Sequence, residues 1–117
     1  MPNALRTIKL DLKPLSVNKA WRGGRRFKTK EYKQYQEEIH WIVHKISPIK
    51  GWVEIDCQFH IKRFKRSDVD NFLKPLLDAL VNAGTIEDDR FVKKITIEKF
   101  ENKEECINLL IKSVGMV

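Results

Sequence analysis

Two adjoining stretches decide how this chain folds: WVEIDCQFHIK (52–62) and RSDVDNFLKPLLDALVNAGTIEDD (66–89). In the first, apolar residues occupy every second position, which is the pattern of a β-strand with one buried face. The second contains an apolar run typical of a helix that extends to about Ala83. Gly84 is a suitable residue to end that helix, because glycine readily adopts positive φ. The sequence therefore predicts a strand and then a helix, with an acidic segment between them.

The segments on either side of this pair also have recognisable periods. Residues 5–12, 91–100 and 105–114 alternate like strands, and residues 29–46 have apolar side chains at helical spacing, with Thr29 as a possible N-cap. The prolines and glycines of 14–30 predict a loop. The last two strands are expected to form a hairpin. The order β-α-β-α-β-β predicts a single α+β domain, 1–117, with a mixed four-stranded sheet covered by two main helices.

Composition narrows the class of protein. The chain has 117 residues, 42% of them hydrophobic and 33% charged, so it has enough apolar residues for a core. It contains no run long enough to span a membrane and begins without the apolar core of a signal peptide, so we expect a cytoplasmic protein. Cys57 and Cys106 lie in strand-like segments without zinc-ligand spacing, and we expect them to be buried free thiols.

The formal net charge is +7, and the positive charge is unevenly distributed. Basic residues dominate 19–33, and a second cluster at 62–66 precedes the acidic segment. Basic clusters bind polyanions through counterion release, so this pattern favours a nucleic-acid-binding surface. A solvated surface without a ligand is the alternative. The residues predicted to contact DNA on this basis are Lys19, Arg22, Arg25, Arg26, Lys28, Lys30 and Arg66.

The clustering of acids within a basic chain predicts a metal site. Asp68 and Asp70 follow the strand at 52–62, and in extended chain residues two apart point the same way, with Cα atoms about 6–7 Å apart. Two carboxylates that close both remain ionised at low cost only beside a cation. Asp88 and Asp89 lie beyond a helix long enough to return the chain toward the first pair. Carboxylates from the two segments would form an all-oxygen site that suits Mg²⁺ or Mn²⁺.

Simpler interpretations of these acids stay open. Asp68 or Asp70 can cap the following helix, since aspartate is a favoured N-cap. Asp88 and Asp89 can be ordinary turn residues. A D-x-D pattern by itself is a weak indication of catalysis.

The complete pattern is more specific than any of its parts. DVDNFLKPLLDALVNAGTIEDD resembles the signature of the RusA family of Holliday-junction resolvases, in which D-x-D-N-x-x-K is followed by D-A-L, A-G and D-D. LSVNKAWRGGRRFKTKEYKQYQEEI (15–39) is also similar to that family, so the resemblance covers most of the chain. It implies a small homodimeric endonuclease, often carried by prophages, that makes paired symmetric nicks in four-way DNA junctions with Mg²⁺ or Mn²⁺.

The resemblance also implies roles for individual residues. Asp68, Asp70 and Asp89 would be the catalytic acids that bind the metal ion. Lys74 would be the essential lysine and contact the DNA near the scissile phosphate. Asp88 would be an adjacent acid whose role the resemblance does not define.

Pro75 departs from the family pattern, in which small residues are common at this position. Proline is compatible with the first turn of a helix but breaks a hydrogen bond in a helix interior. Either the regular helix begins near Pro75, or the helix is kinked there. Asp78 lies four residues after Lys74, within reach of a helical ion pair.

Three functions are consistent with the sequence. The first is the junction resolvase that the resemblance implies. The second is a nuclease of the same fold that acts on flaps or forks. The third is a non-catalytic, basic DNA-binding protein whose acids cap helices.

Overall fold

The computed structural model describes residues 5–23 and 27–115 and places them in one α+β domain with a mixed sheet, as predicted. The strands lie in the order β1 (Leu5–Leu10), β6 (Cys106–Gly115), β4 (Trp52–Ile61) and β5 (Val92–Glu101). Strand β6 is antiparallel to both β1 and β4, whereas β4 and β5 are parallel. Strand β4 is therefore one of the two inner strands of the sheet.

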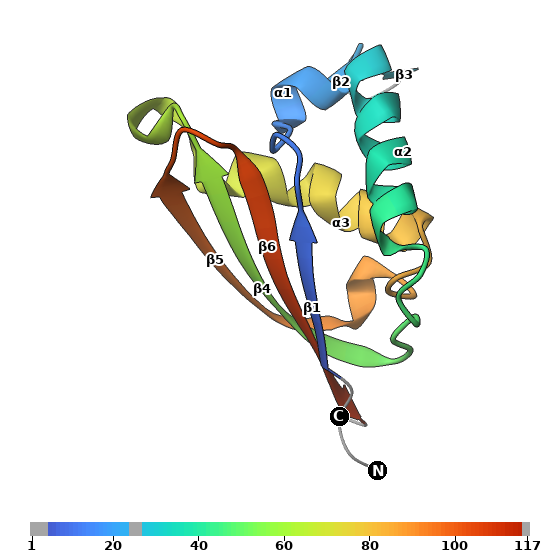
Figure 1. The fold of residues 1–117 in the computed structure, drawn as a ribbon. Coiled ribbons are helices and arrows are strands. Elements are labelled where there is room, and N and C mark those ends of the chain that lie inside the picture. Colours follow the sequence, from blue (N-terminus) through green and yellow to red (C-terminus); the bar gives the residue numbers. More distant parts are fainter. Residues whose placement is uncertain (1–4, 24–26, 116–117) are drawn as a thin grey trace.

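The core lies on one face of the sheet. The alternate residues of β4 predicted to face inward are all buried, with Val53 and Phe59 fully inaccessible, and their polar neighbours Asp56 and Gln58 are exposed on the other face. Helices α2 (Lys30–Val43) and α3 (Leu73–Asn82) lie together on the buried side, as Figure 1 shows. Burial of these apolar side chains is the main stabilising contribution to a domain of this size.

Helix α2 begins where the sequence predicts. The Thr29 hydroxyl accepts a hydrogen bond from the Tyr32 backbone N–H at 3.2 Å, which satisfies one of the free donors of the first turn. The same hydroxyl donates to the carbonyl of Lys19 at 2.6 Å and so ties the helix to the preceding segment. The helix ends at Val43 instead of Ile46, a few residues before Pro48, because a helix does not readily run up to a proline.

Helix α3 is preceded by a 3₁₀ turn, η2 (Val69–Phe72), and starts at Leu73. Pro75 is thus in the first helical turn, where its missing N–H leaves no hydrogen bond broken. This is the first of the two arrangements that the sequence left open.

The segment before α2 differs in part from the prediction. The loop expected at 14–30 contains a single helical turn, α1 (Val17–Ala20), and a short antiparallel pair, β2 (Trp21–Arg22) and β3 (Phe27–Lys28).

The predicted hairpin between the last two strands is wrong. Strands β5 and β6 lie on opposite sides of β4, so they do not pair with each other. Because parallel strands need a long crossover, α3 carries the chain from β4 to β5 on one edge, and β6 then occupies the other edge of β4. The loop that connects β5 to β6 passes the end of β4, where the Asn102 N–H donates to the Ile61 carbonyl at 3.0 Å.

Two expectations from composition can be compared with the structure. Cys57 and Cys106 are free and buried, as predicted. Within the described ranges, no helix is long and apolar enough to cross a membrane.

Candidate functional site

The acidic segment forms the turn that leaves β4. The chain passes through η1 (Phe64–Arg66) and then η2, and the Lys99 ammonium of β5 fastens this turn by donating to the Ser67 carbonyl at 2.9 Å. Asp68 stands immediately before η2 and Asp70 lies within it, both exposed. The Asp68 side chain does not cap the 3₁₀ turn. In the part of the chain that the structure describes, neither carboxylate forms a hydrogen bond or an ion pair, so the oxygens of both are available to a ligand.

A second group of polar side chains surrounds Lys74. Its ammonium lies 2.9 Å from Asp78 Oδ1 and 3.4 Å from Asp89 Oδ2. The Tyr32 hydroxyl donates to Asp78 Oδ2 at 3.3 Å. These four residues, Tyr32, Lys74, Asp78 and Asp89, are called the Lys74 cluster below. They come from α2, α3 and the 3₁₀ turn η3 (Asp89–Phe91), so the tertiary fold brings the first and last parts of the acidic motif into contact.

The electrostatics of the Lys74 cluster are consistent with a charged lysine. The hydrogen bond to Asp78 raises the pKa of Lys74 most, and Asp89 adds to the rise, while partial burial opposes it. Burial, followed by the negative charge of Asp78, raises the pKa of Tyr32. Lys74 is therefore a cation and Tyr32 a neutral donor across the physiological pH range.

Asp88 has a local structural role. Its carboxylate accepts the Arg90 backbone N–H at 3.2 Å and so caps η3. Hydrogen bonding with the Asp89 side chain, and next with the Arg90 N–H, lowers the pKa of Asp88. The interpretation of Asp88 as a turn residue is confirmed.

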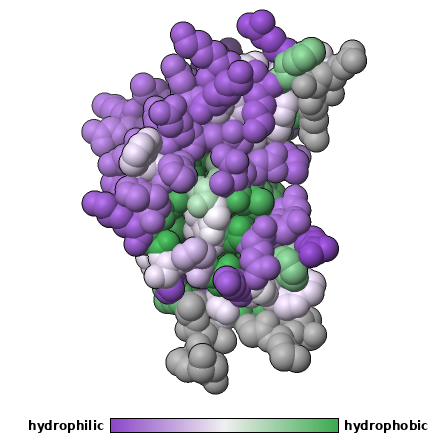
Figure 2. Space-filling model, turned by 90° about the vertical axis from the view of Figure 1, so that its right-hand side faces the viewer, coloured by the Kyte–Doolittle hydropathy of each residue, from purple (hydrophilic) through white to green (hydrophobic). Residues whose placement is uncertain are grey.

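Residues of the acidic motif line two pockets. A pocket of about 360 Å³ lies against the Lys74 cluster and is lined by Lys28, Tyr32, Asp78 and Asp89, among others. A larger pocket of about 900 Å³ has Asp68 in its lining. Hydrophilic side chains cover most of the face that carries α2, and hydrophobic residues are exposed near the centre of that face (Figure 2).

The three predicted metal ligands are not gathered in one place. Among residues 5–23 and 27–115, no three His, Cys, Asp or Glu side chains lie close enough together to hold a metal ion. Asp89 contacts Lys74 and lines the smaller pocket, whereas Asp68 lines the larger one. The structure thus brings Lys74 to Asp89 but does not join Asp89 to Asp68 and Asp70, and their convergence stays a prediction.

The predicted DNA contacts are distributed around the pockets. Lys19 and Arg66 line the larger pocket, and Lys28 lines the smaller one. Arg22 and Lys30 are exposed and line neither pocket. The predictions for Arg25 and Arg26 fall outside the described residues.

Sequence reasoning missed two members of the Lys74 cluster. Tyr32 has the helical spacing of a core residue, and nothing in the sequence indicates that its hydroxyl reaches across to α3. Asp78 was identified only as a helix-paired acid, which is correct for its contact with Lys74 but omits its contact with Tyr32. The contact between Tyr32 and Asp78 joins residues 46 positions apart in the sequence.

A basic α+β domain with an exposed acidic segment and a lysine held between carboxylates has the features of an enzyme that acts on nucleic-acid phosphates. The family model described as "Endodeoxyribonuclease RusA" matches residues 12–112, and the chain belongs to this family. It is 26% identical to "Crossover junction endodeoxyribonuclease RusA" of Aquifex aeolicus (strain VF5), with 96% of each chain covered. It is 31% identical to "Crossover junction endodeoxyribonuclease rusA" of Enterobacteria phage HK97, over 65% of this chain and 68% of the relative.

Proposed function

We propose that this protein resolves four-way DNA junctions by making paired symmetric nicks through metal-dependent phosphodiester hydrolysis. The observation that carries the proposal is the contact of Lys74 with Asp89, which joins the D-x-D-N-x-x-K and D-D parts of the family motif across α3. The names of the two relatives, both crossover junction endodeoxyribonucleases, support the choice of substrate.

The carboxylates of Asp68, Asp70 and Asp89 are the ligands that we propose for the metal ion. Their donor chemistry suits it, because hard oxygen ligands favour Mg²⁺, with Mn²⁺ as a substitute. Asp68 and Asp70 are exposed and unpaired among the described residues, and Asp89 forms an ion pair with Lys74. When bound, such an ion makes the attacking water more acidic and stabilises charge on the phosphate.

Lys74 is proposed to act on the phosphate directly. Hydrolysis builds negative charge on the phosphate oxygens, and a fixed cation beside them lowers the barrier. Asp78 holds the ammonium at 2.9 Å, so the lysine is already positioned before DNA arrives. The basic residues of 19–30 and Arg66 are proposed to draw the DNA backbone toward these acids.

A homodimer is the assembly that the reaction requires. Symmetric resolution cuts two strands related by a two-fold axis, and one chain contains one copy of the acidic motif. A dimer with two-fold symmetry presents two sites related in the same way as the strands.

Cleavage assays on defined DNA substrates test the proposal. The protein is incubated with labelled four-way junctions, linear duplexes and flaps, in Mg²⁺, in Mn²⁺ and in EDTA. We expect symmetric nicks in junctions that depend on the divalent ion. Asp70→Asn should abolish cleavage while junction binding survives. Asp56→Asn is the matched control, because Asp56 is an exposed acid of β4 on the opposite face of the sheet.

The same assays distinguish the proposed function from the other two functions that the sequence left open. Equal cutting of flaps and junctions would favour a flap- or fork-acting nuclease. Tight binding without cleavage in any divalent ion would favour a non-catalytic DNA-binding protein. Loss of cleavage in Asp56→Asn as complete as in Asp70→Asn would contradict the assignment of the site.

A further inference from the structure

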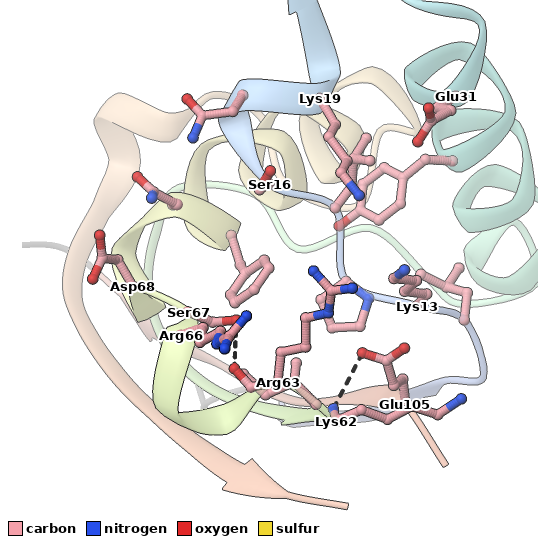
Figure 3. A pocket seen from close by; sticks show the side chains of 18 of the residues that line it. Lys13, Ser16, Lys19, Glu31, Lys62, Arg63, Arg66, Ser67, Asp68 and Glu105 are labelled. Atoms are coloured by element: carbon pink, nitrogen blue, oxygen red, sulfur yellow. Dashed lines mark hydrogen bonds between the residues drawn. The ribbon is translucent and has the colours of Figure 1, made fainter. Parts of the chain in front are cut away.

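The larger pocket has features that the proposed reaction leaves unexplained. It is bounded by the segment from Leu12 to Lys19, by α2, by the end of β4 and by the turn that contains Asp68. The side chains of Lys19 and Arg63 extend into it from opposite sides (Figure 3). Its volume of about 900 Å³ lies within the range of small-molecule and cofactor sites, roughly 300–1,000 Å³.

The basic side chains of this pocket lack partners. Five line it, and within the described ranges none of them forms an ion pair or a side-chain hydrogen bond; they are Lys13, Lys19, Lys62, Arg63 and Arg66. Four acids share the lining, Glu31, Glu38, Asp68 and Glu105, and the last of these accepts the Lys62 backbone N–H at 3.3 Å. The bases exceed the acids by one, and Lys19 and Arg63 extend into the pocket from opposite sides, where an anionic ligand can contact both.

A buried hydroxyl points to the same kind of ligand. Tyr35 lines the pocket and is only 6% exposed, and its hydroxyl, which is inaccessible to solvent in the free protein, has no hydrogen-bond partner among residues 5–23 and 27–115. Burial raises the pKa of Tyr35, so the hydroxyl keeps its proton and is a potential donor. A buried polar group without a partner is costly, and a ligand with an acceptor oxygen would satisfy it. A neutral donor among cations matches an anionic oxygen ligand such as a phosphate.

We propose that this pocket binds a phosphodiester of the DNA strand adjacent to the acidic segment, with Lys19 and Arg63 neutralising it and the Tyr35 hydroxyl donating to one of its oxygens. The inference rests on the proposed function for the identity of the polyanion. Asp68 and Asn71 line the same pocket, so a phosphate held there lies beside the predicted cleavage site. The pocket would thereby set the register of the strand relative to the acids.

Binding measurements with point variants test the inference. Dissociation constants for a fluorescent four-way junction are measured in EDTA at several salt concentrations, so that no cleavage occurs. Arg63→Gln should weaken binding about tenfold and reduce the slope of log Kd against log salt by about 1, because one phosphate contact is lost. Lys65→Gln is the matched control, because Lys65 is an exposed base of η1, the 3₁₀ turn that directly follows Arg63, and does not line the pocket. It should stay within about twofold of the wild type and keep the wild-type slope.

Tyr35→Phe separates a ligand contact from a structural role. The change removes a hydroxyl that has no hydrogen-bond partner within the described part of the free protein, so the melting temperature should not fall. If the hydroxyl donates to a bound phosphate, junction affinity should nevertheless drop about fivefold, as expected for a single lost hydrogen bond. A lower melting temperature with unchanged affinity would overturn this part of the inference.

The source of the phosphate is decided by direct titration. The side-chain Nε resonance of Arg63 is followed by NMR while a single-stranded tetranucleotide of thymidine or inorganic phosphate is added. A shift with the tetranucleotide at concentrations where inorganic phosphate has no effect supports the inference. Equal shifts with both would overturn the assignment to a DNA strand.

The test of phosphate binding in the larger pocket is independent of the cleavage assays that test the proposed function. Junction cleavage by the wild type, combined with unchanged affinity and salt slope in Arg63→Gln, would refute the pocket and leave the proposed function intact. Failure of the wild type to cut junctions would refute the proposed function, while the tetranucleotide titration would still decide whether the pocket binds DNA.

Discussion

Asp78 connects the interior of the protein to the candidate site. One of its oxygens accepts from the Tyr32 hydroxyl and the other contacts the Lys74 ammonium. Tyr32 is fully buried and packs edge-to-face on Trp21 at a centroid distance of 4.7 Å, so its position is well defined. The rigid core thus sets the position of Asp78, and Asp78 in turn sets the position of Lys74.

This chain of contacts predicts that Asp78 and Tyr32 are positioning residues. Asp78→Asn should lower kcat about tenfold, equivalent to about 1.4 kcal/mol of activation free energy, with little change in KM. Tyr32→Phe should have a smaller effect in the same direction. Steady-state cleavage of labelled junctions measures both. A change confined to KM, or equal losses in Glu37→Gln on the exposed face of α2, would contradict this role.

Cys57 belongs to the core and not to the site. Burial raises its pKa to about 12, so the thiol is protonated at neutral pH and is a poor nucleophile. Iodoacetamide at pH 7.5 should therefore leave Cys57 unmodified in the folded protein and label it fully in denaturant. Mass spectrometry of the digested protein measures the labelled fraction. Rapid labelling of the native protein would show that β4 opens readily.

The elements next to the site have well-formed ends. Helix α3 ends in a Schellman motif, in which the Thr85 N–H donates to the Leu80 carbonyl at 2.9 Å and the Gly84 N–H donates to the Val81 carbonyl at 3.0 Å. Gly84 has φ of +80°, which is unfavourable for residues with a Cβ. This turn begins the segment that leads to Asp88 and Asp89, so the end of α3 governs where those acids lie.

Gly84→Ala should destabilise the protein by roughly 1 kcal/mol, the cost of placing a Cβ in the left-handed region. No atom lies within 4 Å of the added Cβ, so steric clash does not contribute. Gly84→Asn should cost less, because asparagine tolerates this conformation better. Urea unfolding measures both free energies. Equal losses in the two variants would contradict a purely conformational origin.

At the scale of the molecule, the sheet separates two different surfaces. Both main helices cover one face (Figure 1), and the Lys74 cluster joins these two helices to the 3₁₀ turn η3. The net charge of +7 gives the whole chain an attraction for DNA, while the acids proposed to bind the metal ion, Asp68, Asp70 and Asp89, lie at short 3₁₀ turns. Long-range attraction and local chemistry are therefore supplied by different parts of the surface.

The proposed symmetric cleavage predicts two chains on each junction. Sedimentation of the protein with a four-way junction in EDTA should give a complex of two protein chains and one DNA. Mixing wild type with an excess of Asp70→Asn should then yield junctions nicked in one strand only. A single chain per junction that still cuts both strands would contradict the dimer.

The strands, the two main helices and the cap at Thr29 could be predicted from local sequence, because alternation, helical spacing and capping chemistry act between near neighbours. The family motif likewise supplied Lys74 and the acids as candidate site residues, and their roles stay predictions. Only the tertiary structure decided that β6 pairs with β4 and not with β5, that Tyr32 reaches Asp78, and that Asp89 meets Lys74. Each of these contacts joins residues that are distant in sequence and depends on the crossover in which α3 connects β4 to β5, and no local period in the sequence encodes that crossover.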